Sequence, residues 1–333
     1  MLDIVIRNGQ VYDGTGNPWT RLDIGIRDGR IVKIGQLHDS EAVLEIEAEG
    51  LAVCPGFIDT HVHSDLLCTK PDIHKIKVLQ GVTTELLGQD GISVAPVNEQ
   101  TKPLWQKQLR GLNGDIGDWP WNSIDEYLQF LSRSTLAGNV AYLVPHGAVR
   151  TLVMGFEGRR ATTEEMRKMR ELVEEGMRQG AVGLSSGLVY PPNLFSCKEE
   201  LIELCKGAAK YDGCFVVHMR NESNHILEAL DEMIDVARRS SVRLHISHFK
   251  VIGRNNRGNF QQALEKWIRP VLRGSRSPLI NIRTQQDQPC YMPCCHRGCT
   301  MGAQRSFSPS CKTQRFAGGL KMTSRTTMIL KTG

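Results

Sequence analysis

The chain contains 333 residues, of which 40% are hydrophobic and 23% are charged, and it has ten cysteines. This length is sufficient for one large domain or two ordinary domains with a substantial core. The composition excludes a small disulfide-stabilised secreted domain and shows no membrane span. No signal-peptide pattern follows Met1, so we expect a soluble cytoplasmic protein without a membrane partner.

Charge is distributed unevenly along the sequence. The formal net charge is +5, yet the residues from Trp267 onward contain eleven Lys and Arg and a single acidic residue, Asp287. The residues before Trp267 are therefore mildly acidic. A basic tail can indicate contact with nucleic acid, but we expect no nucleic-acid partner, because this composition has a different explanation, given below.

Residues 2–35 have the pattern of short strands. Apolar residues alternate with polar ones in segments 2–7, 23–27 and 30–34. The dipeptides Asn8-Gly9 and Asp28-Gly29 separate such segments, and these dipeptides are typical of tight hairpin turns. The pattern predicts a small antiparallel β unit.

Residues 54–65 read CPGFIDTHVHSD, in which an apolar run ends with two histidines one residue apart. In an extended strand, side chains at positions i and i+2 point to the same side. His61 and His63 can therefore present two imidazoles to one divalent metal ion. A bare pair of this kind is more often two surface histidines, so further evidence is needed.

Strands and helices alternate after this segment. Strand patterns occupy residues 82–87, 140–144, 181–186, 214–218 and 242–248. Helical patterns cover about 162–180, 197–211 and 224–239, and the first begins with a capping box at Thr162 and Glu165. Repeated alternation predicts a parallel sheet with chemistry at its carboxyl edge, and it favours a (β/α) barrel.

Polar residues that can bind metal follow several of these strand patterns. They are His61, His63, Asp90, His218 and His248. In a barrel such positions converge on one pocket, and imidazoles with a carboxylate suit Zn²⁺, which activates water for hydrolysis. Each residue alone fits a hydrogen-bonded core histidine or a turn aspartate, and the prediction rests on the joint pattern. We interpret His146 and His245 as structural, and Lys250 as able to bind a substrate carboxylate.

Several segments together resemble the amidohydrolase superfamily and, within it, the N-acyl-D-amino-acid deacylase (D-aminoacylase) family. They are PGFIDTHVHSD (55–65), GQDGISVAP (88–96), GLSSGLVYPP (183–192), HMRNES (218–223) and ISHFK (246–250). The resemblance covers residues 1 to about 266. It implies a TIM-like (β/α) barrel over residues 55–266, beside a small β-sandwich of which residues 1–54 form one part.

The resemblance also implies roles for individual residues. His61 and His63 would bind one metal position, and His218 and His248 would bind the other. Lys250 and Tyr190 would face the substrate, an N-acyl-D-amino acid whose amide is cleaved by water that one or two zinc ions activate. Better-studied members have cysteine at the position of Asp90, and we hypothesise that this carboxylate is a ligand.

The tail after residue 266 departs from the family pattern. Family members have further barrel strands here, and a metal-binding Asp that acts as general base; neither appears, so no catalytic base is assigned. If the codons for residues 280–302 are read in a shifted frame, they can encode a stretch rich in aromatic residues, Pro and Gly that resembles the family. At one position the result is fixed, because the codons of Met292 and Pro293 can then give only alanine. We infer a frameshift near residue 267, with an unstructured tail over 267–333. The competing interpretation is a zinc module formed by Cys290, Cys294, Cys295, His296 and Cys299.

These observations predict metal-dependent deacylation of N-acyl-D-amino acids for the intact protein. The barrel is expected to be incomplete at its C-terminal end, so we expect the chain as written to be inactive and poorly soluble. Two alternatives stay open. One is a cyclic-amide hydrolase of the dihydroorotase or hydantoinase type, and the other is a non-catalytic barrel that binds a partner.

Overall fold

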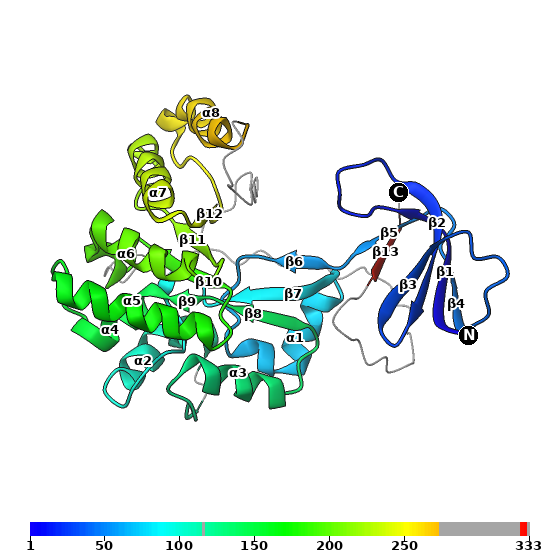
Figure 1. Ribbon diagram of the computed structural model, residues 1–333, viewed down its shortest axis with the longest axis horizontal. Coiled ribbons are helices and arrows are strands. Elements are labelled where there is room, and N and C mark those ends of the chain that lie inside the picture. Colours follow the sequence, from blue (N-terminus) through cyan, green and yellow to red (C-terminus); the bar gives the residue numbers. More distant parts are fainter. Residues whose placement is uncertain (115–116, 273–326, 332–333) are drawn as a thin grey trace, which may run out of the picture.

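The computed structural model describes residues 1–114, 117–272 and 327–331 (Figure 1). A β unit built mainly from the first 55 residues stands beside a larger α/β body. No helix among these residues has the length and apolarity needed to traverse a lipid bilayer.

The β unit is one mixed sheet. Its strands are β1 (Leu2–Val11), β2 (Thr20–Arg27), β3 (Arg30–Gly35), β4 (Ala42–Glu47), β5 (Leu51–Pro55) and β13 (Thr327–Lys331). Strand β1 pairs antiparallel with β2 and parallel with both β4 and β5. Ile6, Ile24, Ala48 and Val53 form its small core. Within residues 2–35 the pairs β1–β2 and β2–β3 are antiparallel, as predicted, and the parallel pairs involve β4 and β5, which lie beyond that range.

The prediction of a hairpin at Asn8-Gly9 is wrong, because β1 continues through these residues as a bulge. The register with β2 shifts between Ile6 and Gly9, and Asn8 adopts a φ of 59°. A Cβ atom at Gly9 would lie 2.5 Å from Val53 Cγ2, so glycine allows the two strands to approach. The bulge divides β1 into a half that pairs with β4 and a half that pairs with β5. The turn predicted at Asp28-Gly29, by contrast, does join β2 to β3.

Two elements depart from the expected unstructured tail. Strand β13 pairs antiparallel with β5, and helix α8 (Asn259–Leu272) passes the expected boundary at residue 266. The sequence TMILK has the β-branched and apolar residues that suit pairing with an open sheet edge. Ala263 and Trp267 of α8 are buried, which accounts for the continuation of the helix. The cysteines at 290–299 lie outside the described residues.

The α/β body contains a row of parallel strands. They are β6 (Phe57–Asp59), β7 (Val82–Leu87), β8 (Asn139–Tyr142), β9 (Val144–Pro145), β10 (Gly183–Gly187), β11 (Cys214–His218) and β12 (Arg243–Ile246). Only Leu143 separates β8 from β9, and its N–H donates to the carbonyl of Leu87 at 3.1 Å. The row β6–β7–β8 therefore continues into β9–β10–β11–β12 in chain order. All carboxyl ends meet at one edge.

Helices connect these strands. They are α1 (Pro71–Val78), α2 (Lys102–Asn113), α3 (Ile124–Arg133), α4 (His146–Met154), α5 (Thr163–Arg178), α6 (Lys198–Ala209), α7 (Ile226–Ser240) and α8, with short 3-10 turns η1 (Leu67–Thr69), η2 (Gln89–Gly91), η3 (Asn193–Phe195) and η4 (Arg254–Asn256). The capping box predicted at Thr162 is present at the start of α5. A second capping box, Ser123 with Glu126, begins α3, which the sequence interpretation missed.

The two units are joined without a loop. Strand β5 ends at Pro55, β6 begins at Phe57, and only Gly56 lies between them. The Phe57 N–H already bonds the carbonyl of Gly81 in the α/β body at 2.9 Å. A Cβ atom at position 56 would lie 2.2 Å from the Thr83 hydroxyl oxygen, so this crossing needs glycine.

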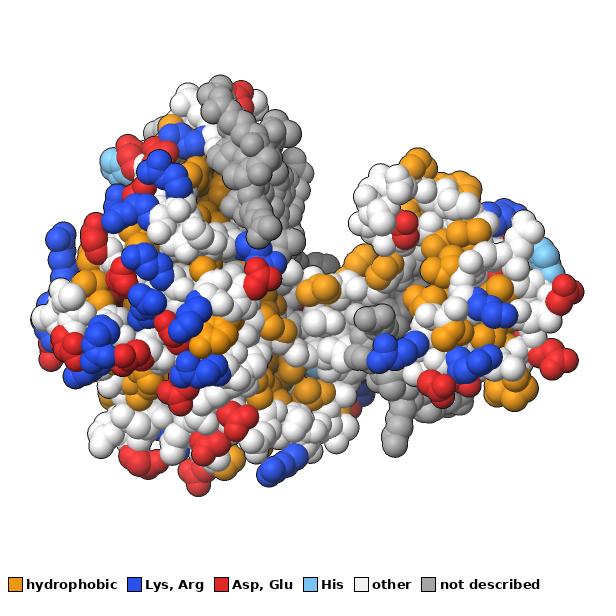
Figure 2. Space-filling model, viewed as in Figure 1, with side chains coloured by type: hydrophobic (Ala, Val, Ile, Leu, Met, Phe, Trp, Pro, Cys, Tyr) orange, Lys and Arg blue, Asp and Glu red, His pale blue; other side chains and the backbone are white. Residues whose placement is uncertain are grey.

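Charged side chains of both signs are interspersed on the face of the α/β body shown in Figure 2. On helix α5, Arg167 pairs with Glu164 at 2.6 Å and with Glu171 one turn later. Such exposed pairs contribute little to stability because water screens them.

A buried polar network ties β9 and α4 to β10 and α6. The imidazole of His146 lies 2.9 Å from the Ser186 hydroxyl and 2.8 Å from Glu200, and Arg150 Nη1 donates to both Glu200 oxygens at 2.6 Å. All four side chains are fully buried. His146 and Arg150 hold the pKa of Glu200 below its usual value, against the opposing effect of burial. The network therefore keeps a buried carboxylate ionised.

Breaking this network should destabilise the fold. Arg150→Met removes the guanidinium that contacts both oxygens of the buried Glu200 carboxylate, so the free energy of unfolding should fall by about 3–5 kcal/mol in urea titration. Adding Glu200→Gln to Arg150→Met should recover part of this loss. Arg167→Met, on the exposed face of α5, is the matched control and should change stability little. Equal effects of Arg150→Met and Arg167→Met would contradict the assignment.

Candidate metal and substrate site

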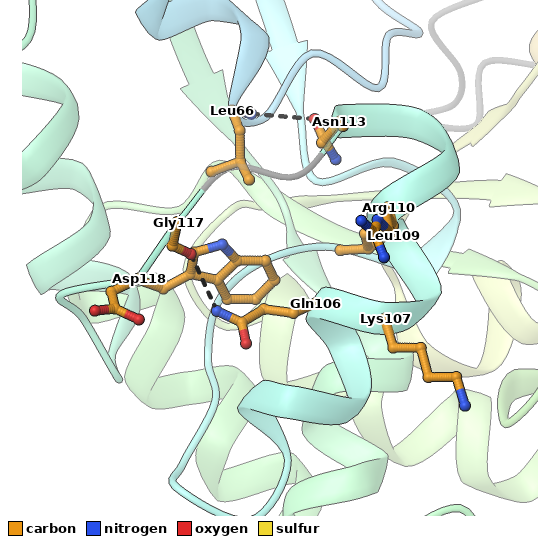
Figure 3. A pocket seen from close by; sticks show the side chains of 10 residues that line it. Leu66, Gln106, Lys107, Leu109, Arg110, Asn113, Gly117 and Asp118 are labelled. Carbon is orange, nitrogen blue, oxygen red and sulfur yellow. Dashed lines mark hydrogen bonds between the residues drawn. The ribbon is translucent and has the colours of Figure 1, made fainter.

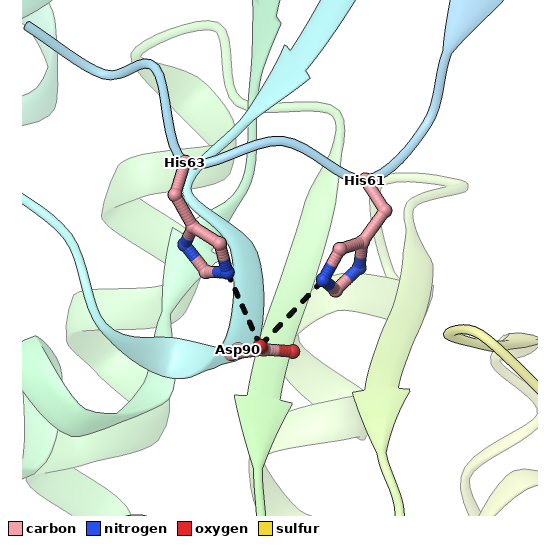
Figure 4. Close-up of side chains that lie close together, drawn as sticks. All are labelled: His61, His63 and Asp90. Carbon is pink, nitrogen blue, oxygen red and sulfur yellow. Dashed lines mark ion pairs between the residues drawn. The ribbon is translucent and has the colours of Figure 1, made fainter. Parts of the chain in front are cut away.

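Four histidines and one aspartate gather at the carboxyl edge of the row of strands. His61 and His63 lie just past β6, in a segment that is not part of the strand. Asp90 lies in η2, just after β7; His218 is the last residue of β11, and His248 follows β12 by two residues. Figure 4 shows His61 and His63 pointing from the β6 loop toward Asp90. The strand rows alone thus bring together residues more than 150 positions apart in sequence.

Asp90 is at the centre of this group. Its Oδ2 atom lies 3.3 Å from His63 Nε2, 3.6 Å from His61 Nε2 and 4.0 Å from His218 Nδ1. The ring of His248 completes the group, with its centroid 4.8 Å from that of His61 and 4.4 Å from that of His218.

Two sets of donors share the Asp90 carboxylate. His61, His63 and Asp90 form one set, and Asp90, His218 and His248 form the other. In each set, one potential ligand atom from each residue lies within 4.8 Å of the other two. Nitrogen and carboxylate donors at such spacing fit Zn²⁺ or a similar divalent ion.

The hydrogen bonding of the group supports this interpretation. His61 Nδ1, His63 Nδ1, His218 Nδ1 and Asp90 Oδ1 are buried and have no hydrogen-bond partner. Buried polar atoms are normally paired because an unpaired one costs about 1–3 kcal/mol. His61 and His63 face Asp90 with Nε2, so a cation held there would bind these atoms and leave both Nδ1 atoms unpaired. Asp90 Oδ1 and His218 Nδ1 are the unpaired atoms available to a metal, and in this respect the donor set fits one.

The protonation states of His61 and Asp90 favour ligation, whereas Asp90 raises the pKa of His63 against the effect of burial. Burial, reinforced by the neighbouring histidines, lowers the pKa of His61 to about 4 despite the charge of Asp90. Burial opposes ionisation of Asp90, but hydrogen bonding to His63 and the charges of His61 and His218 lower its pKa to about 2. At neutral pH, His61 is therefore an uncharged imidazole and Asp90 a carboxylate, which are the forms that bind metals.

Glu222 belongs to this site, although the sequence interpretation did not select it. Its carboxylate lies 2.8 Å from His248 Nδ1, 2.5 Å from Lys250 Nζ and 3.7 Å from His218 Nε2. Against the effect of burial, these groups hold its pKa below the usual value. A carboxylate behind a ligand histidine fixes the orientation of the ring. The available signal was an acid four residues after His218, inside the motif HMRNES.

The two predicted substrate residues border the histidines. Lys250 Nζ lies 3.0 Å from His248 Nδ1, and the Tyr190 ring centroid lies 5.3 Å from that of His218. His146 belongs instead to the buried network described above. His245 lies within β12 and is in neither donor set.

A separate pocket of about 360 Å³ lies between helix α2 and residues 117–119 (Figure 3). Gln106 Nε2 donates to the carbonyl of Gly117 at 3.3 Å, and Leu66 N–H donates to Asn113 at 3.2 Å. None of the histidines or Asp90 lines this pocket. It is therefore distinct from the candidate metal site.

Parallel strands alternating with helices, with imidazole and carboxylate donors at the carboxyl edge, define a (β/α)-barrel protein with a candidate metal centre. Residues 44–282 match the model of the amidohydrolase family, and the chain belongs to this family. This match confirms the predicted superfamily, and it extends beyond the expected boundary at residue 266.

The chain is similar to proteins of known activity. It is 37% identical over 262 residues to D-aminoacylase from Alcaligenes xylosoxydans xylosoxydans, covering 79% of this chain and 53% of the relative. The chain thus spans about half the length of the curated relatives it matches. A solved structure of N-acyl-D-glutamate deacylase from Bordetella bronchiseptica, complexed with zinc and a phosphonate inhibitor, is 32% identical with a TM-score of 0.75. It covers 84% of this chain and 58% of that protein.

A solved L-hydantoinase from Arthrobacter aurescens is more distant, at 18% identity and a TM-score of 0.54 over 83% of this chain and 57% of that protein. At this identity the likeness concerns the fold alone. Together these neighbours confirm the predicted TIM-like barrel class.

Proposed function

We propose that this chain carries the metal centre of an amidohydrolase that cleaves the linear amide of N-acyl-D-amino acids. The observation that carries the proposal is the pair of donor sets around Asp90, in a chain 37% identical to a D-aminoacylase. The zinc-containing deacylase of similar fold supports Zn²⁺ as the ion. One or two ions fit, since the two sets share a single carboxylate.

The residues of the site would have separate roles in binding the metal. His61, His63 and Asp90 would hold one metal position, and His218 and His248, with the same aspartate, would hold the other. A bound zinc ion supplies Lewis acidity, which polarises the amide carbonyl and lowers the pKa of a water ligand. Glu222 would orient His248 through the contact at Nδ1.

Lys250 and Tyr190 would bind the substrate. The ammonium of Lys250 lies next to His248 and would pair with the α-carboxylate of an N-acyl amino acid. The Tyr190 ring, packed at the edge of His218, would border the acyl or side-chain group. Lys250 contacts Glu222 at 2.5 Å, so this carboxylate would hold the ammonium in place before substrate arrives.

Removal of Asp90 should empty the metal centre. Because Asp90 belongs to both donor sets, Asp90→Ala should lower the zinc content of the purified, dialysed protein to a small fraction of the wild-type content, as measured by elemental analysis. Asp212→Ala is a matched control, because Asp212 also has a left-handed φ, 56° against 57° for Asp90, but lies on the surface. Unchanged zinc in Asp90→Ala would exclude this carboxylate as a ligand.

We also propose that the reading frame changes near residue 267. The loss of acidic residues, the abrupt gain of Cys and Arg, and the family-like stretch encoded in a shifted frame support this. Since the family match continues to residue 282, the change of frame could fall somewhat later than the composition suggests.

An independent DNA read across codons 255–305 tests this proposal. We expect a single inserted or deleted base relative to the sequence as written, after which the corrected product regains the closing strands and an Asp near the last one. An unchanged frame would exclude an error in the reported sequence and leave a broken gene as the source of the tail.

Activity distinguishes the substrate classes. With zinc, the frame-corrected chain should hydrolyse an N-acetyl-D-amino acid faster than its L enantiomer, and a chelator or His63→Ala should abolish turnover. His225→Ala, an exposed histidine, is the control. Turnover of a hydantoin alone would instead indicate a cyclic-amide hydrolase, and metal-free protein without turnover would favour a partner-binding barrel.

Finally, we propose a cytoplasmic location. Cys54, Cys68, Cys197, Cys205 and Cys214 are all free thiols, which is usual in a reducing compartment. Recovery of the protein in the soluble cytoplasmic fraction of its cells would support this location, and recovery from a membrane or secreted fraction would oppose it.

A further inference from the structure

The segment that carries Asp90 has an unusual backbone. Gly88, Asp90 and Gly91 all adopt left-handed φ values, of 77°, 57° and 67°. L-residues other than Asn and Asp rarely adopt this conformation. A turn of this kind persists only when surrounding groups hold it, so its contacts decide where the Asp90 carboxylate points.

Strand β10 holds the turn from one side. The Ser185 hydroxyl donates to the carbonyl of Gly88 and accepts from the N–H of Gly91 at 3.0 Å. One side chain thus bridges the first and last residues of the turn. Two residues along the strand, a Cβ atom at Gly187 would lie 2.7 Å from the Asp90 carbonyl oxygen, so the strand lies directly against the turn.

The loop after β10 holds the turn from a second direction. Asn193, in η3, donates from Nδ2 to the carbonyl of Asp90 at 3.2 Å. Both Ser185 and Asn193 are fully buried. Neither side chain belongs to either donor set, so any effect on the metal would pass through the turn.

We infer that Ser185 and Asn193 are positioning residues that aim the Asp90 carboxylate at the metal position. This inference rests on the proposed metal-binding function and extends it to two side chains outside the donor sets. Groups that orient a ligand in this way typically change metal affinity by about 10–100-fold when removed.

The neighbouring Ser186 offers a matched control. It is on the same strand and equally buried, but its hydroxyl contacts His146 at 2.9 Å and not the turn. If Ser185 acts on Asp90, Ser185→Ala should weaken zinc binding by the full chain about 10–100-fold, while Ser186→Ala should leave the affinity within about twofold. Competition with a chromogenic chelator measures zinc affinity, and thermal unfolding of the metal-free chains checks folding.

A double-mutant cycle separates positioning from a general structural effect. In the Asp90→Ala background, Ser185→Ala should cause no further loss of the remaining zinc affinity, because the group it positions is absent. An equal loss in both backgrounds, or equal losses from Ser185→Ala and Ser186→Ala, would overturn the inference.

Asn193→Ala provides a second test if Ser185→Ala does not fold. It removes a single donor to the Asp90 carbonyl and should also weaken zinc binding only when Asp90 is present. Unaltered affinity in Asn193→Ala would count against the inference. If the wild-type chain itself binds no zinc, the proposed metal centre fails first, and the positioning role fails with it.

Discussion

The site depends on one carboxylate that four histidine side chains surround, from the carboxyl ends of β6, β11 and β12. Asp90 contributes to both donor sets, and its backbone adopts a left-handed conformation that Asp tolerates better than most L-residues. The parallel strands supply the general convergence, since all of them end at the same edge. The fine placement comes from short polar contacts around a single turn.

Two polar networks of different character lie within the α/β body. Around Glu200, buried charges are matched by Arg150 and His146 at hydrogen-bond distance. Around Asp90, four buried polar atoms have no hydrogen-bond partner. In the first network both ring nitrogens of His146 and both oxygens of Glu200 have partners, although Arg150 Nε has none, and the network stabilises the fold. The pairing of both ring nitrogens distinguishes His146 from His61, His63 and His218, whose Nδ1 atoms have no hydrogen-bond partner.

The sequence allowed much of the site to be predicted, because strand ends are visible as apolar runs followed by His or Asp. His61, His63, Asp90, His218 and His248 were selected in this way and the structure brings them together, while their roles as metal ligands stay a prediction. Glu222 was missed because it follows a strand by four residues, and only the loop geometry brings it back to His248. The Asn8-Gly9 pair was misread because the same dipeptide suits a hairpin and a bulge, and the choice depends on strands β4 and β5. The register shift that distinguishes them is tertiary information.

The crossing at Gly56 has a consequence for how the protein can be divided. A boundary at residue 54 would fall inside β5, which ends at Pro55, and two residues later the Phe57 N–H is already bonded to the α/β body. The small sheet and the barrel strands are thus successive lengths of nearly continuous extended chain, with no linker in which to cut. A barrel excised at residue 54 would begin with part of β5, and the two units are best treated as one covalent frame joined through a single glycine.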